Sequence, residues 1–133
     1  MTYLLDTNAC VRYLNGRAVS VRTRMASMPS NTVAVCSIVK AEMYTGAMKS
    51  VEPERTLLKQ EAFLSQFYSL PFDDEAAMIY GNIRAQLEIA GTPIGPYDLQ
   101  IAAIAFANNL TLVTHNIREF SRVPGLLLED WEI

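Results

Sequence analysis

Short apolar segments alternate with longer helical patterns along this chain, and that order constrains its fold more than any other feature. A helix between two strands carries the chain back across the sheet, so such strands run parallel and are covered by helices on both faces. The sequence therefore predicts a three-layer α/β/α fold around a central, mostly parallel sheet. The expected strands cover residues 3–5, 32–36, 68–70, 111–114 and 126–128, and the expected helices lie near 7–15, 18–28, 38–49, 53–66, 74–90 and 97–108.

The composition predicts one soluble, cytoplasmic domain that covers residues 1–133. Half of the residues are apolar, which is enough to bury a sizeable core. No apolar run reaches the ~18 residues that span a membrane, and the first residues lack the pattern of a signal peptide. Cys10 and Cys36 form no CxxC motif, so we expect reduced thiols packed in the core. Trp131 is expected to close that core.

The net charge of −3 does not by itself indicate a protein that binds nucleic acid. The first fifty residues nevertheless hold six basic side chains and only two acidic ones, Asp6 and Glu42. If these two acids bind a metal ion, the rest of this half is basic and could guide a polyanion towards them. A solvated helix face explains the same pattern equally well. The basic residues are Arg12, Arg17, Arg22, Arg24, Lys40 and Lys49.

Polar residues follow two of the predicted strands. Asp6 comes directly after the apolar segment 3–5, and Asn116 comes shortly after the strand at 111–114. In α/β folds ligands bind at the carboxyl edge of the sheet, where a buried carboxylate is costly unless a cation pairs with it. Asp6 is therefore a candidate metal ligand. Asn116 is a candidate partner in the same site, or an ordinary turn residue.

Two further acids lie on helices that follow strands. Glu42 shares a helix face with two aliphatic residues that should point inwards, so its carboxylate is expected at or beside the core. It could bind a metal ion or pair with an arginine such as Arg84. Asp98 falls in the first turn of a helix that is apolar on every side from 101 to 107. It could bind metal, or cap the helix and meet its dipole.

These residues can converge, because the carboxyl ends of parallel strands meet at one edge of the sheet. Oxygen ligands without cysteine or histidine pairs suit Mg²⁺ or Mn²⁺ rather than zinc. A cation would relieve the repulsion between the carboxylates, lower the pKa of a water molecule and neutralise charge on a phosphate oxygen. Glu119 could add a charge to this site or be a solvated acid, and Arg84 could neutralise the cluster or brace its helix. The pattern favours a metal-dependent hydrolase acting on phosphodiesters.

Four segments of the chain resemble the PIN-domain ribonucleases, specifically the VapC-type toxins of bacterial toxin–antitoxin pairs. They are LLDTN, SIVKAEMYTG, GTPIGPYDLQIAAIA and LTLVTHNIREFSRVPGLLLEDW, in the order and spacing of that family. The resemblance implies one PIN domain and a Mg²⁺-dependent endoribonuclease, with Mn²⁺ as the other candidate ion. Asp6, Glu42 and Asp98 would form its acidic triad. Asn116 would stand where many members carry a fourth acid, and Thr7 would hold a ligand or a water molecule.

The resemblance also implies a substrate and partners. Members of this kind commonly cut structured RNA, often tRNA in the anticodon loop, and so arrest translation. Hydrolysis by attack of water on the phosphorus would leave a 3′-hydroxyl and a 5′-phosphate. Such proteins usually form homodimers, and hetero-oligomers with a cognate antitoxin that threads a segment across the active-site groove. No membrane is implied.

Several alternatives stay open from the sequence. A phosphatase of the haloacid dehalogenase type needs a second aspartate where Asn8 stands. A non-catalytic PIN-like module that binds RNA or a protein is allowed by Asn116, and a PIN nuclease outside any toxin pair is allowed throughout. His115 could touch a phosphate or be an exposed strand-end residue. Tyr97 could stack on a base or pack beneath its loop.

Overall fold

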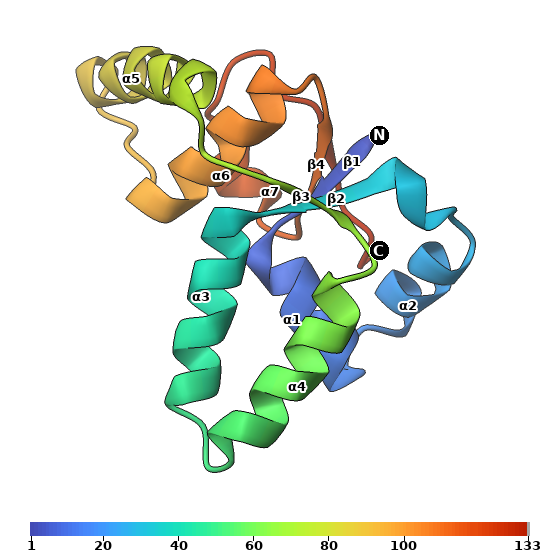
Figure 1. Ribbon diagram of the computed structural model, residues 1–133. Coiled ribbons are helices and arrows are strands. Elements are labelled where there is room, and N and C mark those ends of the chain that lie inside the picture. The colour runs from blue at the N-terminus through green and yellow to red at the C-terminus, as the bar shows by residue number, and fades with distance from the viewer. Residues whose placement is uncertain (133) are drawn as a thin grey trace.

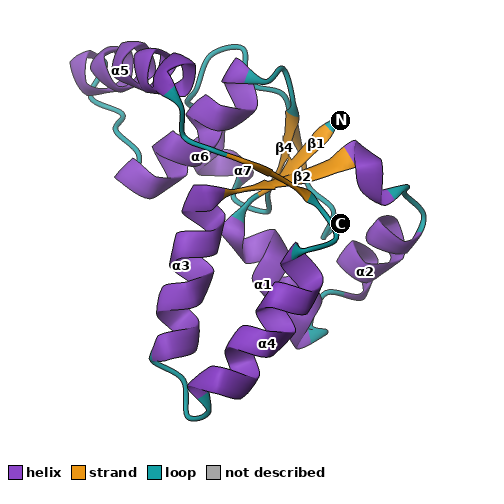
Figure 2. Ribbon diagram, viewed as in Figure 1, coloured by secondary structure: helices purple, strands orange, loops and turns teal. Residues whose placement is uncertain are grey.

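The computed structural model describes residues 1–132 and places their strands in a single parallel sheet (Figures 1 and 2). The strand order is β3-β2-β1-β4-β5, and each neighbouring pair is parallel. This confirms the predicted sheet, except that β5 begins two residues later than expected. The strands are β1 (Tyr3–Leu5), β2 (Val33–Cys36), β3 (Tyr68–Leu70), β4 (Thr111–Val113) and β5 (Leu128–Glu129).

The helices cover both faces of this sheet, as the three-layer prediction requires. Crossovers between parallel strands are right-handed, so the steps from β1 to β3 and the return from β3 to β4 place their helices on opposite faces. In Figure 1, α1 to α4 lie on one side of the strands and α5 and α6 on the other. The helices are α1 (Thr7–Asn15), α2 (Val19–Ala26), α3 (Ser37–Met48), α4 (Pro53–Leu64), α5 (Asp74–Ile89), α6 (Pro96–Ala107) and α7 (Ile117–Phe120).

The helix ends follow from local chemistry. The carboxylate of Asp73 accepts a 2.9 Å hydrogen bond from the Ala76 amide and so caps α5. Pro53 and Pro96 occupy the first turns of α4 and α6, where a missing amide proton costs nothing. Gly16 ends α1 with a φ of 65°, a left-handed conformation that glycine adopts without strain. The predicted helix boundaries are therefore accurate to within a few residues, whereas α7 is a short addition.

The core lies between the sheet and its two helical layers. Trp131 is 2% exposed and packs edge-on against Tyr3, with 5.2 Å between the ring centroids, so its predicted place in the core is confirmed. Cys10 and Cys36 are free and buried, which confirms the expectation of unpaired thiols. Burial raises the pKa of the Cys36 thiol to about 11, so it stays protonated and unreactive near neutral pH. No helix within residues 1–132 is long and apolar enough to cross a membrane.

Candidate active site

The strand order reverses at β1 and β4, which creates a crevice at their carboxyl ends. β1 pairs with β4 in register, with Leu5 opposite Val113. The chain leaves β1 through α1, on one face of the sheet, whereas it enters β4 from α6, on the other face. Ligands in open α/β sheets bind at such a switch point. Asp6 and Thr114, the residues that directly follow these two strands, therefore line the expected position of a ligand.

Asp6 is a buried carboxylate at this switch point, with 4% of its surface exposed. Its Oδ1 accepts a 2.8 Å hydrogen bond from the Ala9 amide in the first turn of α1. Burial raises the pKa of Asp6 to about 6, and the negative charges of Asp98 and Glu132 add to that rise. Hydrogen bonds from Thr114 and Ala9 lower this pKa but do not cancel the effect. Burial and the neighbouring acids therefore disfavour the charged form of Asp6, and a nearby cation would stabilise that form.

Thr7 links α1 to Glu42 on α3. Its hydroxyl donates a 2.6 Å hydrogen bond to Oε1 of Glu42, which is half-buried. Because α3 begins directly after β2, Glu42 comes to the same edge of the sheet as Asp6. The second carboxylate oxygen of Glu42 is not used in this bond and can serve as a ligand.

Asp98 lies in the first turn of α6 and shares its electrostatic environment with the other acids. Burial raises the pKa of Asp98 to about 6, and the charges of Glu119 and Glu42 raise it further. The negative charge of Asp98 also raises the pKa of Asp6. The structure therefore brings together Asp6, Glu42 and Asp98, the three acids predicted as metal ligands.

Asn116 and Glu119 form the other side of the site. The Asn116 side-chain amide donates a 3.1 Å hydrogen bond to Oε2 of Glu119. Oε1 of Glu119 lies 3.3 Å from the Gly95 amide, on the loop that leads into α6. Glu119 thus connects α7 to the segment that carries Asp98. It is neither a free solvated acid nor remote from the acidic triad.

The polar partners of Arg84 lie on its own helix, which agrees with the alternative that it braces that helix rather than neutralises the acidic cluster. Its guanidinium contacts Glu88 at 2.9 Å and the Tyr80 hydroxyl at 2.8 Å, both on its own helix α5. These contacts raise the pKa of Arg84, with the bond to Glu88 contributing most. Helix periodicity explains the pairing, because residues four positions apart share a face.

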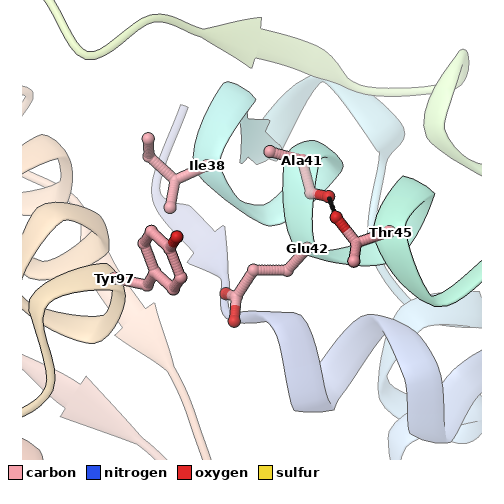
Figure 3. A pocket seen from close by; sticks show the side chains of 5 residues that line it. All are labelled: Ile38, Ala41, Glu42, Thr45 and Tyr97. Atoms are coloured by element: carbon pink, nitrogen blue, oxygen red, sulfur yellow. Dashed lines mark hydrogen bonds between the residues drawn. The ribbon is translucent and has the colours of Figure 1, made fainter.

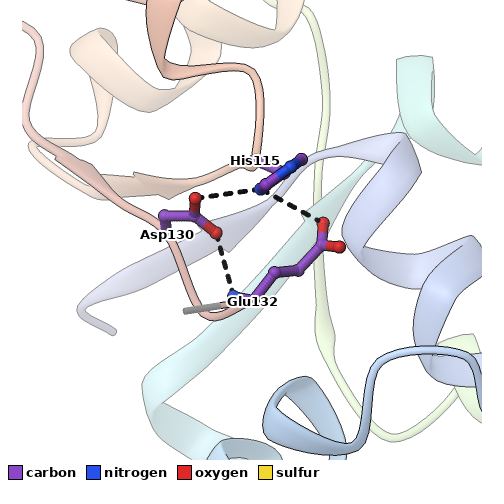
Figure 4. A group of neighbouring side chains, drawn as sticks. All are labelled: His115, Asp130 and Glu132. Carbon is purple, nitrogen blue, oxygen red and sulfur yellow. Dashed lines mark hydrogen bonds and ion pairs between the residues drawn. The ribbon is translucent and has the colours of Figure 1, made fainter.

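The triad does not form a tight cage. Within residues 1–132, one group of three histidine, cysteine or acidic side chains has ligand atoms that all lie within 4.8 Å of one another. It consists of His115, Asp130 and Glu132 (Figure 4). Asp6, Glu42 and Asp98 are spaced more widely. Repulsion between carboxylates favours such spacing, and Mg²⁺ commonly binds through one or two carboxylates while keeping several water molecules. An open set of oxygen donors therefore fits a hydrated Mg²⁺ or Mn²⁺ ion.

His115 belongs to a separate group beside the site. Its Nδ1 is 2.9 Å from Oδ2 of Asp130 and 3.8 Å from Oε2 of Glu132, whose other oxygen is 3.5 Å from Arg12 Nε. These contacts hold the segment after β5 against the end of β4. Sequence reasoning missed Thr114, Asp130 and Glu132, although Glu132 acts on the pKa of Asp6. The closing LEDW motif was the available signal for Asp130; Glu132 had none.

Half of the basic residues in residues 1–50 are used within the protein. Arg12 pairs with Glu132, and Arg24 lies 2.7 Å from Glu129. Arg22 lies over the ring of Tyr13, 4.9 Å from its centroid. The prediction of a basic surface that guides a polyanion therefore depends on the remaining three basic residues, Arg17, Lys40 and Lys49.

Comparison with known proteins agrees with this fold. The profile of the PIN domain family matches residues 3–126. The tRNA(fMet)-specific endonuclease VapC of Salmonella typhimurium is 40% identical over 131 residues, which cover 98% of both chains. Ribonuclease VapC2 of Rickettsia felis is 42% identical over 133 residues, 99% of both chains. The crystal structure of DNA-bound VapBC from Salmonella typhimurium superposes with a TM-score of 0.93 at 40% identity, covering 98% of both chains.

The fold, the acidic site and the matching profile define a PIN-domain protein. More particularly, the chain belongs to the VapC group of PIN-domain ribonucleases, because its relatives in that group align over nearly their whole length. The family predicted from the four sequence segments is confirmed.

Proposed function

We propose that this protein, as one PIN domain over residues 1–133, is a metal-dependent endoribonuclease and the toxin of a toxin–antitoxin pair. The observation that supports the proposal most directly is the convergence of Asp6, Glu42 and Asp98 at the switch point of the sheet. Burial and the charges of neighbouring carboxylates raise the pKa of Asp6 and of Asp98 to about 6. A fold that concentrates negative charge in this way is suited to a divalent cation.

The ion that fits best is Mg²⁺, with Mn²⁺ as the alternative, because the donors are oxygen atoms throughout. Asp6, Glu42 and Asp98 would hold it. When bound, it would neutralise charge on the scissile phosphate and lower the pKa of a water molecule. The expected products are a 3′-hydroxyl and a 5′-phosphate.

The protein's own residues keep these carboxylates in position. The Ala9 amide orients the carboxylate of Asp6, and the Thr7 hydroxyl fixes one oxygen of Glu42. Glu119 fastens the loop before α6 through the Gly95 amide, which sets the first turn where Asp98 lies. Such supporting contacts commonly change metal affinity or activity about 10- to 100-fold when they are removed.

Structured RNA such as tRNA is the proposed substrate, and arrest of translation is the proposed consequence. The Salmonella relative is a tRNA(fMet)-specific endonuclease by name, and similarity over nearly the whole chain supports a related substrate here. The superposed VapBC structure supports a cognate antitoxin as partner. A homodimer, its hetero-oligomer with the antitoxin and a cytoplasmic location complete the proposal.

The test is cleavage of total cellular RNA by the purified protein, with Mg²⁺ or with EDTA. Asp98→Asn removes one ligand charge with little change in shape, and Arg84→Ala is the matched control because the polar partners of Arg84, Glu88 and Tyr80, lie on its own helix α5. Discrete fragments are expected from the wild type and from Arg84→Ala, and none from Asp98→Asn or in EDTA. Cutting that survives in Asp98→Asn would show that the site is elsewhere or that the activity is a contaminant. No cutting by folded wild-type protein would favour a non-catalytic module that binds RNA or a protein.

A further inference from the structure

An apolar pocket opens directly beside the acidic triad. It lies between α3 and the start of α6, has a volume of about 280 Å³ and is lined by Ile38, Ala41, Glu42, Thr45 and Tyr97 (Figure 3). Glu42 belongs both to this pocket and to the triad. Tyr97 immediately precedes Asp98, so the pocket shares two elements with the proposed metal site. Whatever binds there lies beside the proposed metal site.

The walls of the pocket offer apolar surface and one aromatic face. Ile38 and Ala41 are aliphatic, and the Thr45 hydroxyl is already committed to the Ala41 carbonyl at 2.9 Å. Tyr97 lies across the pocket from α3 and is 59% exposed. The alternative that Tyr97 packs beneath its loop is therefore wrong. A single exposed aromatic residue is common on protein surfaces. An exposed ring that faces an apolar pocket beside a candidate active site instead indicates a binding surface.

We propose that this pocket receives one unpaired nucleobase next to the scissile phosphate, with the Tyr97 ring stacked on it. This proposal rests on the proposed nuclease function and names how that site selects its substrate. Proteins recognise RNA by sequence chiefly where bases are unpaired and can stack on aromatic side chains. Tyr97 is thus a specificity-determining residue that favours cleavage in a loop or at a bulge over cleavage within a duplex.

Size and charge both favour a base over other occupants. The volume of about 280 Å³ lies just below the roughly 300 Å³ at which pockets for larger small molecules begin. Glu42 is the charged residue of the lining, so it would repel a phosphate or an acidic peptide, whereas a neutral base meets no such penalty. Because Glu42 belongs both to the pocket and to the triad, a base in the pocket lies beside the proposed metal site.

The test compares Tyr97→Phe and Tyr97→Leu with the wild type on a labelled RNA stem–loop that spans a cleavage site mapped from total RNA. Phenylalanine keeps the ring, whereas leucine keeps apolar character without it. We expect Tyr97→Phe to retain activity within about threefold and Tyr97→Leu to lose about 5- to 100-fold in kcat/KM. An abasic nucleotide at one position beside the cut should lower the kcat/KM of the wild type by a similar factor. The same abasic RNA should lower the kcat/KM of Tyr97→Leu only slightly, because that variant has already lost the stacking.

Several results would overturn the proposal. If Tyr97→Leu cleaves as well as the wild type, or is equally sensitive to the abasic substitution, no base stacks on Tyr97. If Tyr97→Leu cleaves normally but escapes inhibition by a partner protein, the pocket accepts a protein side chain instead. Thermal unfolding of each variant separates these results from loss of fold. If the wild type cuts no RNA, the proposed function fails first; if it cuts and Tyr97→Leu does too, only the pocket assignment fails.

Discussion

The hydroxyl of Thr7 donates a 2.6 Å hydrogen bond to Oε1 of Glu42, across 35 positions of sequence. This bond joins the first residue of α1 to the middle of α3, the helices that follow the neighbouring strands β1 and β2. A carboxylate hydrogen bond of this length is strong, and it restricts the rotation of the Glu42 side chain. The hydroxyl beside Asp6 therefore sets the position of a different acid of the triad.

Replacing Thr7 with valine should weaken the site without disturbing the fold. Valine keeps the branched shape but cannot donate to Glu42, so we expect kcat/KM to fall about 10- to 100-fold and the Mg²⁺ requirement to increase. Thr7→Ser keeps the hydroxyl and should stay close to the wild type. The measurement is the initial rate of RNA cleavage over a range of Mg²⁺ concentrations. Equal rates for the valine and serine variants would show that the bond to Glu42 does not matter.

Replacing Asp6 with asparagine should stabilise the metal-free protein at neutral pH. The pKa of Asp6 rises from an ordinary 3.8 to about 6, so between these values the folded protein keeps a proton that the unfolded chain releases. The stability contributed by this group is complete below about pH 4 and is lost as the pH rises through 6, by about 3 kcal/mol at most. Asp6→Asn does not suffer this loss. Urea unfolding in EDTA should show no difference between the two proteins at pH 4 and a growing advantage for the variant up to pH 7.

Mg²⁺ should reverse that penalty in the wild type. The ion competes with protons for Asp6 and Asp98, whose pKa values are both about 6, so its stabilising effect should be large above that pH and small below it. At a Mg²⁺ concentration 100 times its Kd, the gain is about 2.7 kcal/mol. Thermal unfolding with Mg²⁺ and with EDTA at pH 5 and pH 8 measures it. A gain of the same size in Asp98→Asn would place the ion elsewhere.

The sequence predicted those site residues whose position follows from the fold itself. Asp6 directly follows β1, Glu42 lies on the helix that begins directly after β2, and Asp98 lies in the first turn of the helix that begins at Pro96. A parallel sheet brings these three positions to one edge. Asn116 and Glu119 could be placed near this edge, but the hydrogen bond between them could not, because it depends on the short helix α7.

Side-chain pairing over long distances in the sequence was beyond such reasoning. Charge alone allows Arg84 to pair with Glu42, whereas the structure pairs it with Glu88 one helical turn away. Glu132 meets Arg12 and acts on the pKa of Asp6 because the chain after β5 returns alongside α1. Neither the direction of that final segment nor the exposure of Tyr97 is encoded in a local pattern.

Replacing Asn116 with aspartate should make the protein more dependent on its metal ion. The Asn116 amide now donates to Glu119 at 3.1 Å, and a carboxylate in its place removes the donor and adds repulsion. We expect the metal-free variant to lose about 1 to 3 kcal/mol of unfolding free energy at pH 7. Mg²⁺ should recover much of that loss, because an added carboxylate beside Glu119 also attracts the cation. Asn116→Ala, which removes the donor without adding charge, should lose less and recover less with Mg²⁺. Urea unfolding of both variants in EDTA and in Mg²⁺ measures the difference. If the aspartate variant is as stable as the wild type in EDTA, the acids around Glu119 are too well solvated to repel one another.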